Sequence, residues 1–395
     1  SGRNPIQLNR YVVLVVMLIC TAVALSAQTP GKDIRHERLI DADHFELRIN
    51  KPDSPAEWDE RKKDIRETLL KTPKVKSRAC MLFPRTQYIQ IQEEYFNVGL
   101  SFELFLRGFG ELDIIHEEQI VDDTINGYEL LVMFDVKLLP EKTAGHIASF
   151  VRNGGVVIAD CLPALNEFRE PMTAMEELFG VSDSATGRIV RTGHYIDFKT
   201  KEPIWDFRDE HAPDETIITT DLLKSTIFGQ ALDMTIVSPR PCNVTSGTIL
   251  TTTVTGKPAV VTKTTGKGRV FLLGFCLQDS YFKTWQDNNR DDRSTLRGLL
   301  MSLTEKAGVR SHVWSSNPDI EASIRANDLG GFLFIINHEA KDPDTVIQLA
   351  GLDFTIGSIT DMETGGNVSF EIVDDEVQLE VRATRDNVKI FRLMR

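Results

Sequence analysis

The stretch "ELLVMFDVKLLPEKTAGHIASFVRNGGVVIADC", from Glu129 to Cys161, decides the fold class. Two short apolar runs, "ELLVMF" and "GVVIAD", enclose a segment with an apolar stripe at helical spacing, formed by Ala144, Ile147, Ala148 and Val151. Pro140 precedes this segment and Gly154 follows it, which are the helix ends that proline and glycine favour. The stretch therefore predicts two adjacent parallel strands joined by a right-handed crossover helix.

The alternation of strands and helices extends over residues 76–310. Fully apolar runs such as "ACMLF" and "GVVIAD" are typical of a parallel sheet covered on both faces, so we expect a doubly wound α/β domain. From Arg188 to Val261 the pattern is rich in short strands, and "GTILTTTV" and "GKPAVVTKTTGKGRVFLLGF" predict hairpins attached to the main sheet. The "TGKG" of Thr265 to Gly268 lacks the full spacing of a phosphate loop and predicts a tight turn.

The two ends of the α/β region have a different character. Residues 311–395 contain short alternating runs such as "GGFLFIINHE", separated by Gly, Asn and Asp, which predict a small antiparallel β-sandwich domain. Residues 28–75 predict an N-terminal extension with one helix, capped by Ser54 and carrying Trp58, Ile65 and Leu69 at near-helical spacing.

The N-terminal run "YVVLVVMLICTAVALSAQ" follows Arg10 and closes on small residues. A basic start, an apolar centre and a small-residue end predict a signal peptide over residues 1–27 and export to the periplasm or the extracellular space. The alternative is that the run spans a bilayer as an uncleaved anchor. Beyond this segment we expect no contact with a membrane.

Charge and cysteine usage exclude several classes of partner and cofactor. The net charge of −13 disfavours nucleic-acid binding, which needs a basic surface. Beyond the signal the cysteines are Cys80, Cys161, Cys242 and Cys276, which we interpret as core thiols rather than a disulfide framework. Because no C-x-x-C, H-E-x-x-H or close His/Cys cluster occurs, we expect no metal and no cofactor.

Several segments together resemble a known family. "YELLVMFDVKLLPEKTAGHIASFVRNGGVVIAD", "AMEELFGV" and "GKPAVVTKTTGKGRVFLLG" are similar to the trimerisation domain of family 42 β-galactosidases, which has the class I glutamine amidotransferase-like, flavodoxin-like fold. "IEASIRANDLGGFLFIINHEAKDPDTVIQLAG" and "VKIFRL" resemble the small C-terminal β-domain of the same enzymes. The resemblance covers residues 76–395. It implies a role in carbohydrate metabolism, a homo-oligomer with a trimer favoured, and a carbohydrate or a carbohydrate-active enzyme as partner.

The resemblance does not extend to the catalytic apparatus of those galactosidases. Their two catalytic carboxylates lie in a (β/α)₈ barrel before the trimerisation domain, and such a barrel needs about 250 residues. The residues before Lys76 are too few to form one, so no catalytic glutamate can be carried over. The adjacent pairs Glu93/Glu94, Glu117/Glu118 and Glu176/Glu177 are interpreted as solvated surface carboxylates, since nothing in their spacing makes two of them face one sugar.

Cys161 is the candidate catalytic residue, because amidotransferases of this fold place their nucleophilic thiol after the corresponding strand. A working thiol needs a base, usually a histidine, and a group that orients the base. The family's His-x-Glu pair is absent from the matching segment "VFLLGFCLQDSYFKTW", and Asp160 and Leu162 flank the cysteine where active members have glycines. His146 and His194 remain as partners, but both are interpreted as surface histidines.

Two functions from different classes stay open. The first is an exported, non-catalytic assembly or binding module related to β-galactosidases. The alternative is a hydrolase, either related to glycosidases or a fragment of one, or a cysteine hydrolase that uses Cys161. The missing barrel and the missing His-x-Glu pair favour the first.

Overall fold

The computed structural model describes residues 72–91, 95–182, 195–196, 203–204, 219–240, 242–317, 319–337, 342–384 and 388–395. The predicted signal peptide and the helix that follows Ser54 lie outside these residues. The described chain forms two compact units: one holds Arg78–Leu104 and Leu112–Val309, and the other holds residues 72–77, Phe105–Glu111 and Arg310–Arg395. The domain limits expected from the sequence, 76–310 and 311–395, stay predictions.

The larger unit is built on a mixed sheet of seven strands in the order β11-β12-β13-β4-β3-β1-β2. The strands are β1 (Ala79–Phe83), β2 (Asp113–His116), β3 (Leu130–Met133), β4 (Val156–Ala159), β11 (Thr248–Thr252), β12 (Pro258–Thr265) and β13 (Gly268–Leu273). All neighbours from β13 to β2 are parallel, whereas β11, β12 and β13 form antiparallel pairs. Leu130 lies opposite Val156, so the predicted parallel pairing of the two apolar runs is confirmed.

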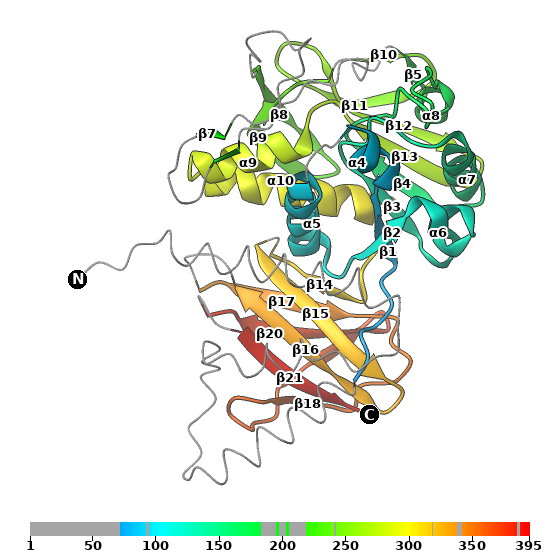
Figure 1. Ribbon diagram of the computed structural model, residues 1–395. Coiled ribbons are helices and arrows are strands. Elements are labelled where there is room, and N and C mark those ends of the chain that lie inside the picture. Colours follow the sequence, from blue (N-terminus) through cyan, green and yellow to red (C-terminus); the bar gives the residue numbers. More distant parts are fainter. Residues whose placement is uncertain are drawn as a thin grey trace. The chain divides into compact units, whose positions relative to one another are not determined.

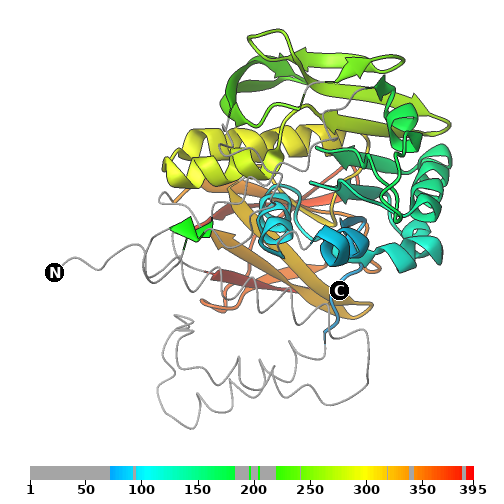
Figure 2. The ribbon, with the colours of Figure 1, turned by 45° about the horizontal axis from the view of Figure 1, so that its top comes forward.

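Helices lie on both sides of this sheet. They are α4 (Arg85–Ile91), α5 (Tyr95–Phe109), α6 (Glu117–Val121), α7 (Glu141–Arg152), α8 (Ala174–Phe179), α9 (Leu277–Gln286) and α10 (Arg290–Lys306), with a 3₁₀ turn η1 (Thr124–Gly127). Figures 1 and 2 show α6, α7 and α8 on one side and α9 and α10 on the other. The predicted stripe of α7 is buried against the sheet at Ala144, Ile147 and Val151. In the described part of the chain, no helix is long and apolar enough to cross a membrane.

The strand-rich region of the larger unit splits into separate parts. Strands β12 and β13 form a hairpin in the main sheet, and Gly266 lies in its turn with φ of 63°, so the predicted tight turn at "TGKG" is confirmed. Strands β8 (Thr220–Ile227) and β9 (Gln230–Val237) instead form their own two-stranded ribbon, which packs on α10. The segments predicted as attached hairpins, "GTILTTTV" and "GKPAVVTKTTGKGRVFLLGF", form β11, β12 and β13 and do join the main sheet. The remaining short pairs are β5 (Val181–Ser182) with β10 (Asn243–Val244), and β6 (Tyr195–Ile196) with β7 (Pro203–Ile204).

The smaller unit contains two four-stranded antiparallel sheets, ordered β14-β17-β20-β19 and β15-β16-β21-β18. The strands are β14 (Val313–Ser315), β15 (Ile320–Asn327), β16 (Gly330–Asn337), β17 (Asp344–Leu349), β18 (Ser358–Asp361), β19 (Glu371–Val373), β20 (Glu376–Arg382) and β21 (Val388–Met394). Side chains from both sheets, including Leu333, Ile347 and Leu379, form one buried cluster. The antiparallel β-structure predicted for the C-terminal region is present.

Candidate functional site

The place to look for a site follows from the strand order. The chain runs from β1 to β2 on one side and then returns to β3 on the other side of β1. In open α/β sheets, ligands bind outside the carboxyl ends of the strands at such a reversal. The crevice beyond β1 and β3 is therefore the natural ligand position of this sheet.

Gln87, in the first turn of α4, occupies this crevice with its own side chain. Its Oε1 accepts hydrogen bonds from Lys137 N (2.6 Å) and Leu138 N (3.1 Å), and its Nε2 donates to Asp135 O (2.9 Å). The side chain thus satisfies three backbone groups of the loop after β3, which would otherwise need water or a ligand. Gln87 is buried, so the crevice is closed at this point by the protein itself.

Asp160 fills the corresponding position at the end of the next strand, directly after β4. Its carboxylate is fully buried and accepts from Asp135 N (2.7 Å) and from Leu277 N (2.9 Å) at the start of α9. Arg240 lies beside it, with Nη1 3.4 Å from Oδ1 and 2.9 Å from the backbone oxygen of Asp160. One carboxylate therefore ties the loop after β3, the start of α9 and the segment after β9 to the end of β4.

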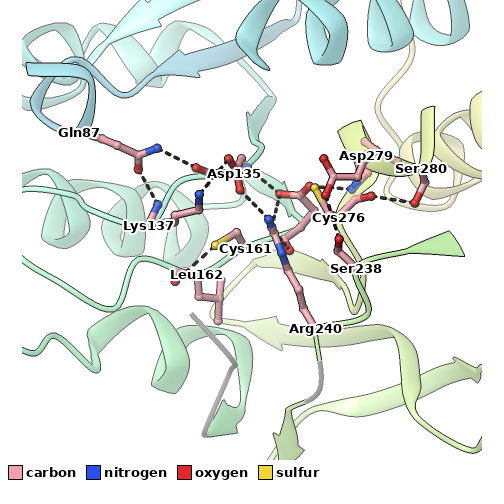
Figure 3. A network of polar contacts seen from close by, with 12 residues as sticks. Gln87, Asp135, Lys137, Cys161, Leu162, Ser238, Arg240, Cys276, Asp279 and Ser280 are labelled. Atoms are coloured by element: carbon pink, nitrogen blue, oxygen red, sulfur yellow. Dashed lines mark hydrogen bonds and ion pairs between the residues drawn. The ribbon is translucent and has the colours of Figure 1, made fainter. Parts of the chain in front are cut away.

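Asp135 completes a charged cluster with two cations (Figure 3). Its carboxylate lies 2.5 Å from Arg240 Nη2 and 3.3 Å from Lys137 Nζ. Asp135 also has a left-handed backbone, with φ of 53°, which turns its N–H toward Asp160. Two carboxylates thus face one guanidinium and one ammonium, and the formal charges of the cluster balance.

A second group of polar contacts fixes the segment that carries Arg240. Ser238, with φ of 49°, donates from Oγ to Asp279 Oδ2 at 2.9 Å, and its backbone oxygen accepts from Cys276 N at 3.2 Å. Ser280 Oγ accepts from Val237 N (2.9 Å) and donates to Cys276 O (2.8 Å). The first turn of α9 therefore sets the position of Arg240.

The two aspartates of the cluster are perturbed in opposite directions. Burial raises the pKa of Asp160 to about 6. The Arg240 guanidinium acts to lower this pKa, and the nearby Asp135 carboxylate acts to raise it. Burial also acts against the Asp135 carboxylate, but Lys137 and Arg240 outweigh it and lower the pKa of Asp135. The cations therefore stabilise the charge on Asp135 more than the charge on Asp160.

Cys161 follows Asp160 in sequence and is a buried thiol. Its side chain is 2% exposed, and its Sγ has a weak contact of 3.9 Å with Leu162 O. Burial raises the pKa of Cys161 to about 12, so the thiol is protonated at neutral pH. Cys276 is also buried, and burial raises its pKa well above the ordinary range. Reactive cysteines need the opposite, a partly exposed and electropositive setting that favours the thiolate.

The histidines proposed as bases do not meet this thiol in the described structure. His146 lies on α7, and its Nδ1 is 3.2 Å from Asp123 Oδ1. His194 lies outside the described residues. Among the described residues, no three His, Cys, Asp or Glu side chains are grouped so that they could hold a metal ion.

The glutamate pairs give one correction. Glu117 was expected on the surface, but it is 4% exposed and accepts from Thr86 N (3.0 Å) and Thr86 Oγ1 (2.5 Å). The reason is its place at the carboxyl end of β2, where the chain enters α6 and Glu117 turns toward the first turn of α4; burial raises its pKa. Glu118 is exposed and pairs with Arg85, as expected.

Of the other two pairs, the structure describes only Glu176 and Glu177. Glu177 is exposed and Glu176 half-buried on α8, whereas Glu93 and Glu94 lie outside the described residues. The residues that close the crevice, namely Gln87, Asp135, Asp160 and Arg240, were not predicted as site residues. Asp135 and Asp160 directly follow apolar runs, a signal that could have marked them. Gln87 and Arg240 have no such signal.

Comparisons with known proteins find similar folds in solved structures of glycoside hydrolases. No family model and no curated protein matches the chain. The β-galactosidase from Bacillus circulans sp. alkalophilus has a TM-score of 0.54 at 15% identity, over 86% of this chain and 44% of its own. A catalytic mutant of Gan42B, a GH42 β-galactosidase from G. stearothermophilus, has a TM-score of 0.53 at 15% identity, over 88% of this chain and 45% of its own.

A third solved structure broadens the group. The α-L-fucosidase isoenzyme 2 from Paenibacillus thiaminolyticus has a TM-score of 0.53 at 12% identity, over 84% of this chain and 51% of its own. At these identities the likeness is one of fold. The chain spans less than half the length of the two β-galactosidase chains, so it corresponds to part of their architecture.

Proposed function

We propose that this chain is a non-catalytic assembly or binding module that works with carbohydrate-active enzymes. The observation that carries the proposal is that buried side chains fill the carboxyl ends of the strands, Gln87 beyond β1 and β3 and Asp160 beyond β4. A catalytic site needs room for a substrate beside its reacting groups. Here those positions are filled by buried side chains that bind the protein's own backbone.

The likeness to glycoside hydrolases supports the carbohydrate part of the proposal. It covers most of this chain and less than half of the two β-galactosidases, as expected for a shared accessory region. The strand order and the crossover helix α7 support a flavodoxin-like, amidotransferase-like α/β domain over residues 76–310, followed by a β-domain over 311–395. Export through the signal at residues 1–27 belongs to the same proposal.

The chemistry of the described residues disfavours a cysteine hydrolase. Nucleophilic attack requires a thiolate, but burial raises the pKa of Cys161 to about 12. The groups around it are Asp135, Asp160, Lys137 and Arg240, whose charges already pair with one another. No histidine among the described residues contacts its sulfur.

Activity assays on the purified chain test the proposal. We expect no turnover of aryl-galactosides, aryl esters or glutamine, and no change on Cys161→Ala, while circular dichroism confirms folding of both proteins. Glu117→Gln removes the charge of a buried glutamate and provides the matched carboxylate test. Robust turnover that one of these substitutions abolishes in a folded protein would contradict the proposal. Retention of the chain on a polysaccharide gel, without hydrolysis, would support it.

A further inference from the structure

The edge strand β19 of the smaller unit presents an unusual surface. In the described sheet it lies last in the order β14-β17-β20-β19 and pairs with β20 alone. A strand in this position has backbone N–H and C=O groups on its outer side that can pair with another strand. Proteins use such edges to bind extended segments of other chains.

The side chains of β19 leave apolar surface uncovered. Ile372 lies opposite Val377 in the register and therefore shares its face of the sheet, which is the core face because Val377 is buried. Ile372 is nevertheless 61% exposed, and the neighbouring Val373 is 41% exposed. Phe370, two residues earlier, still packs against the core cluster. The inner face of the sheet thus continues past the core and ends on an exposed isoleucine.

The charge around this edge selects its partner. The ten residues from Glu371 to Glu380 contain five carboxylates and no lysine or arginine, and one of the five, Glu376, pairs with Arg310 at 3.4 Å. Two of them, Asp374 and Asp375, form the turn of the hairpin with φ of 50° and 65°. A second copy of the chain would bring the same carboxylates together, and like charges repel. The surface therefore disfavours self-pairing and complements a basic segment.

We propose that the edge of β19 binds an extended segment of a partner protein whose apolar side chains alternate with lysine or arginine. Added beside β19 as a further strand, this segment covers Ile372 with its apolar face. Its basic face meets Glu371 and the acidic turn of Asp374 and Asp375. Main-chain pairing supplies the attachment, and the alternation of side chains supplies the specificity. This inference is independent of the proposed role in carbohydrate metabolism.

A defined peptide tests the apolar half of this proposal. The probe is a short, fluorescently labelled peptide in which valine and lysine alternate, and its binding to the full chain is followed by fluorescence anisotropy. Ile372→Asp is expected to weaken binding at least about tenfold, because it places a charge where the apolar face docks. Leu329→Asp is the matched control, since Leu329 is 74% exposed in the turn between β15 and β16. It is expected to leave binding unchanged.

The acidic half is tested by replacing Asp374 and Asp375 together with asparagine. Asparagine tolerates the same left-handed backbone, so the hairpin keeps its turn while two charges are lost. Weaker binding and a smaller salt dependence are expected. A peptide with glutamate in place of lysine is expected not to bind. Failure of the lysine peptide to bind, equal binding of the glutamate peptide, or unchanged binding by Ile372→Asp would each overturn the proposal.

Discussion

Asp160 shows how one residue makes stability depend on pH. Its pKa in the folded protein is raised to about 6, so folding favours its protonated form. This contribution to stability is complete below the unfolded pKa of about 4 and is lost as the pH rises through about 6. Asp160→Asn cannot titrate. We therefore expect the difference in unfolding free energy, native chain minus variant, to fall between these pH values in urea titrations.

A second substitution serves as the control for the loss of a carboxylate charge. Asp233→Asn removes a carboxylate that pairs with Lys224 on the exposed ribbon of β8 and β9. It is expected to change stability by less than about 0.5 kcal/mol at any of these pH values. If the difference in unfolding free energy between the native chain and Asp160→Asn stayed constant or grew with pH, Asp160 would titrate in another pH range.

Gln87 gives a second prediction at this scale. Gln87→Ala deletes the partner of Asp135 O, Lys137 N and Leu138 N, all in a buried loop. Each orphaned buried group costs about 1–3 kcal/mol, so we expect a loss of about 3 kcal/mol in chemical denaturation. Gln348→Ala, at a half-buried glutamine of β17, is expected to cost less than about 0.5 kcal/mol. Equal losses for the two variants would mean that Gln87 does not close the crevice.

The residue scale is where prediction from sequence was least complete. The sequence could place Cys161 just after a strand, because the apolar run "GVVIAD" ends immediately before it. In the structure that strand is β4. Arg240 could not be connected to Asp160, because 80 residues separate them and their contact depends on how β9 and α9 pack. Glu117 looked exposed because its burial comes from Thr86, which belongs to a different strand–helix connection.

At the scale of elements, close backbone packing holds β13 against α7. A Cβ on Gly268 would lie 2.2 Å from both Gly155 O and Val151 O, too close for any side chain. Gly268→Ala is expected to destabilise the protein by about 3 kcal/mol or more, measured by denaturant unfolding. Gly145→Ala, in α7 with open space around its Cβ, is the matched control. It is expected to stabilise the helix by about 0.5–1 kcal/mol.

Elements were predicted better than their partners. The strands β3 and β4 and the helix α7 between them follow from local periodicity, because a crossover of this length leaves parallel neighbours as the outcome. Along β8 and β9, buried residues also alternate with more exposed ones for most of their length. Alternation identifies a strand with one buried face, but it does not say which surface covers that face. Here α9 and α10 contact β9, while β8 lies beside β11 of the main sheet.

At the scale of the whole molecule, the fold likeness raises the question of assembly. The resemblance of residues 76–310 to a trimerisation domain motivates the prediction that the mature chain forms a homotrimer. Apolar side chains are exposed together on the larger unit: Leu222 on β8 and Val254 after β11 are joined by a hydrogen bond from Val254 N to Leu222 O (2.9 Å). Ile249 on β11 is also exposed. Exposed apolar groups of this kind mark contact surfaces.

Charge opposes this assembly, and salt decides how strongly. Each chain carries a net charge of −13, so subunits repel one another at long range. At physiological salt the screening length is about 8 Å, which removes most of that repulsion while leaving apolar contacts intact. The trimer is therefore expected to strengthen as salt rises. Light scattering on the signal-free chain is expected to give close to three times the mass of one chain at micromolar concentration.

A matched pair of variants locates the contact. Val254→Asp places a charge among the exposed apolar side chains of β8 and β11. It is expected to shift the scattering mass toward a single chain, because the free energy cost of burying an unpaired carboxylate exceeds the free energy gained from the apolar contact. Leu329→Asp places the same charge on the smaller unit and is expected to leave the mass unchanged. Dissociation by Leu329→Asp alone would assign the contact to the smaller unit. A native chain with the mass of one copy across the micromolar range, at low and high salt, would rule the trimer out.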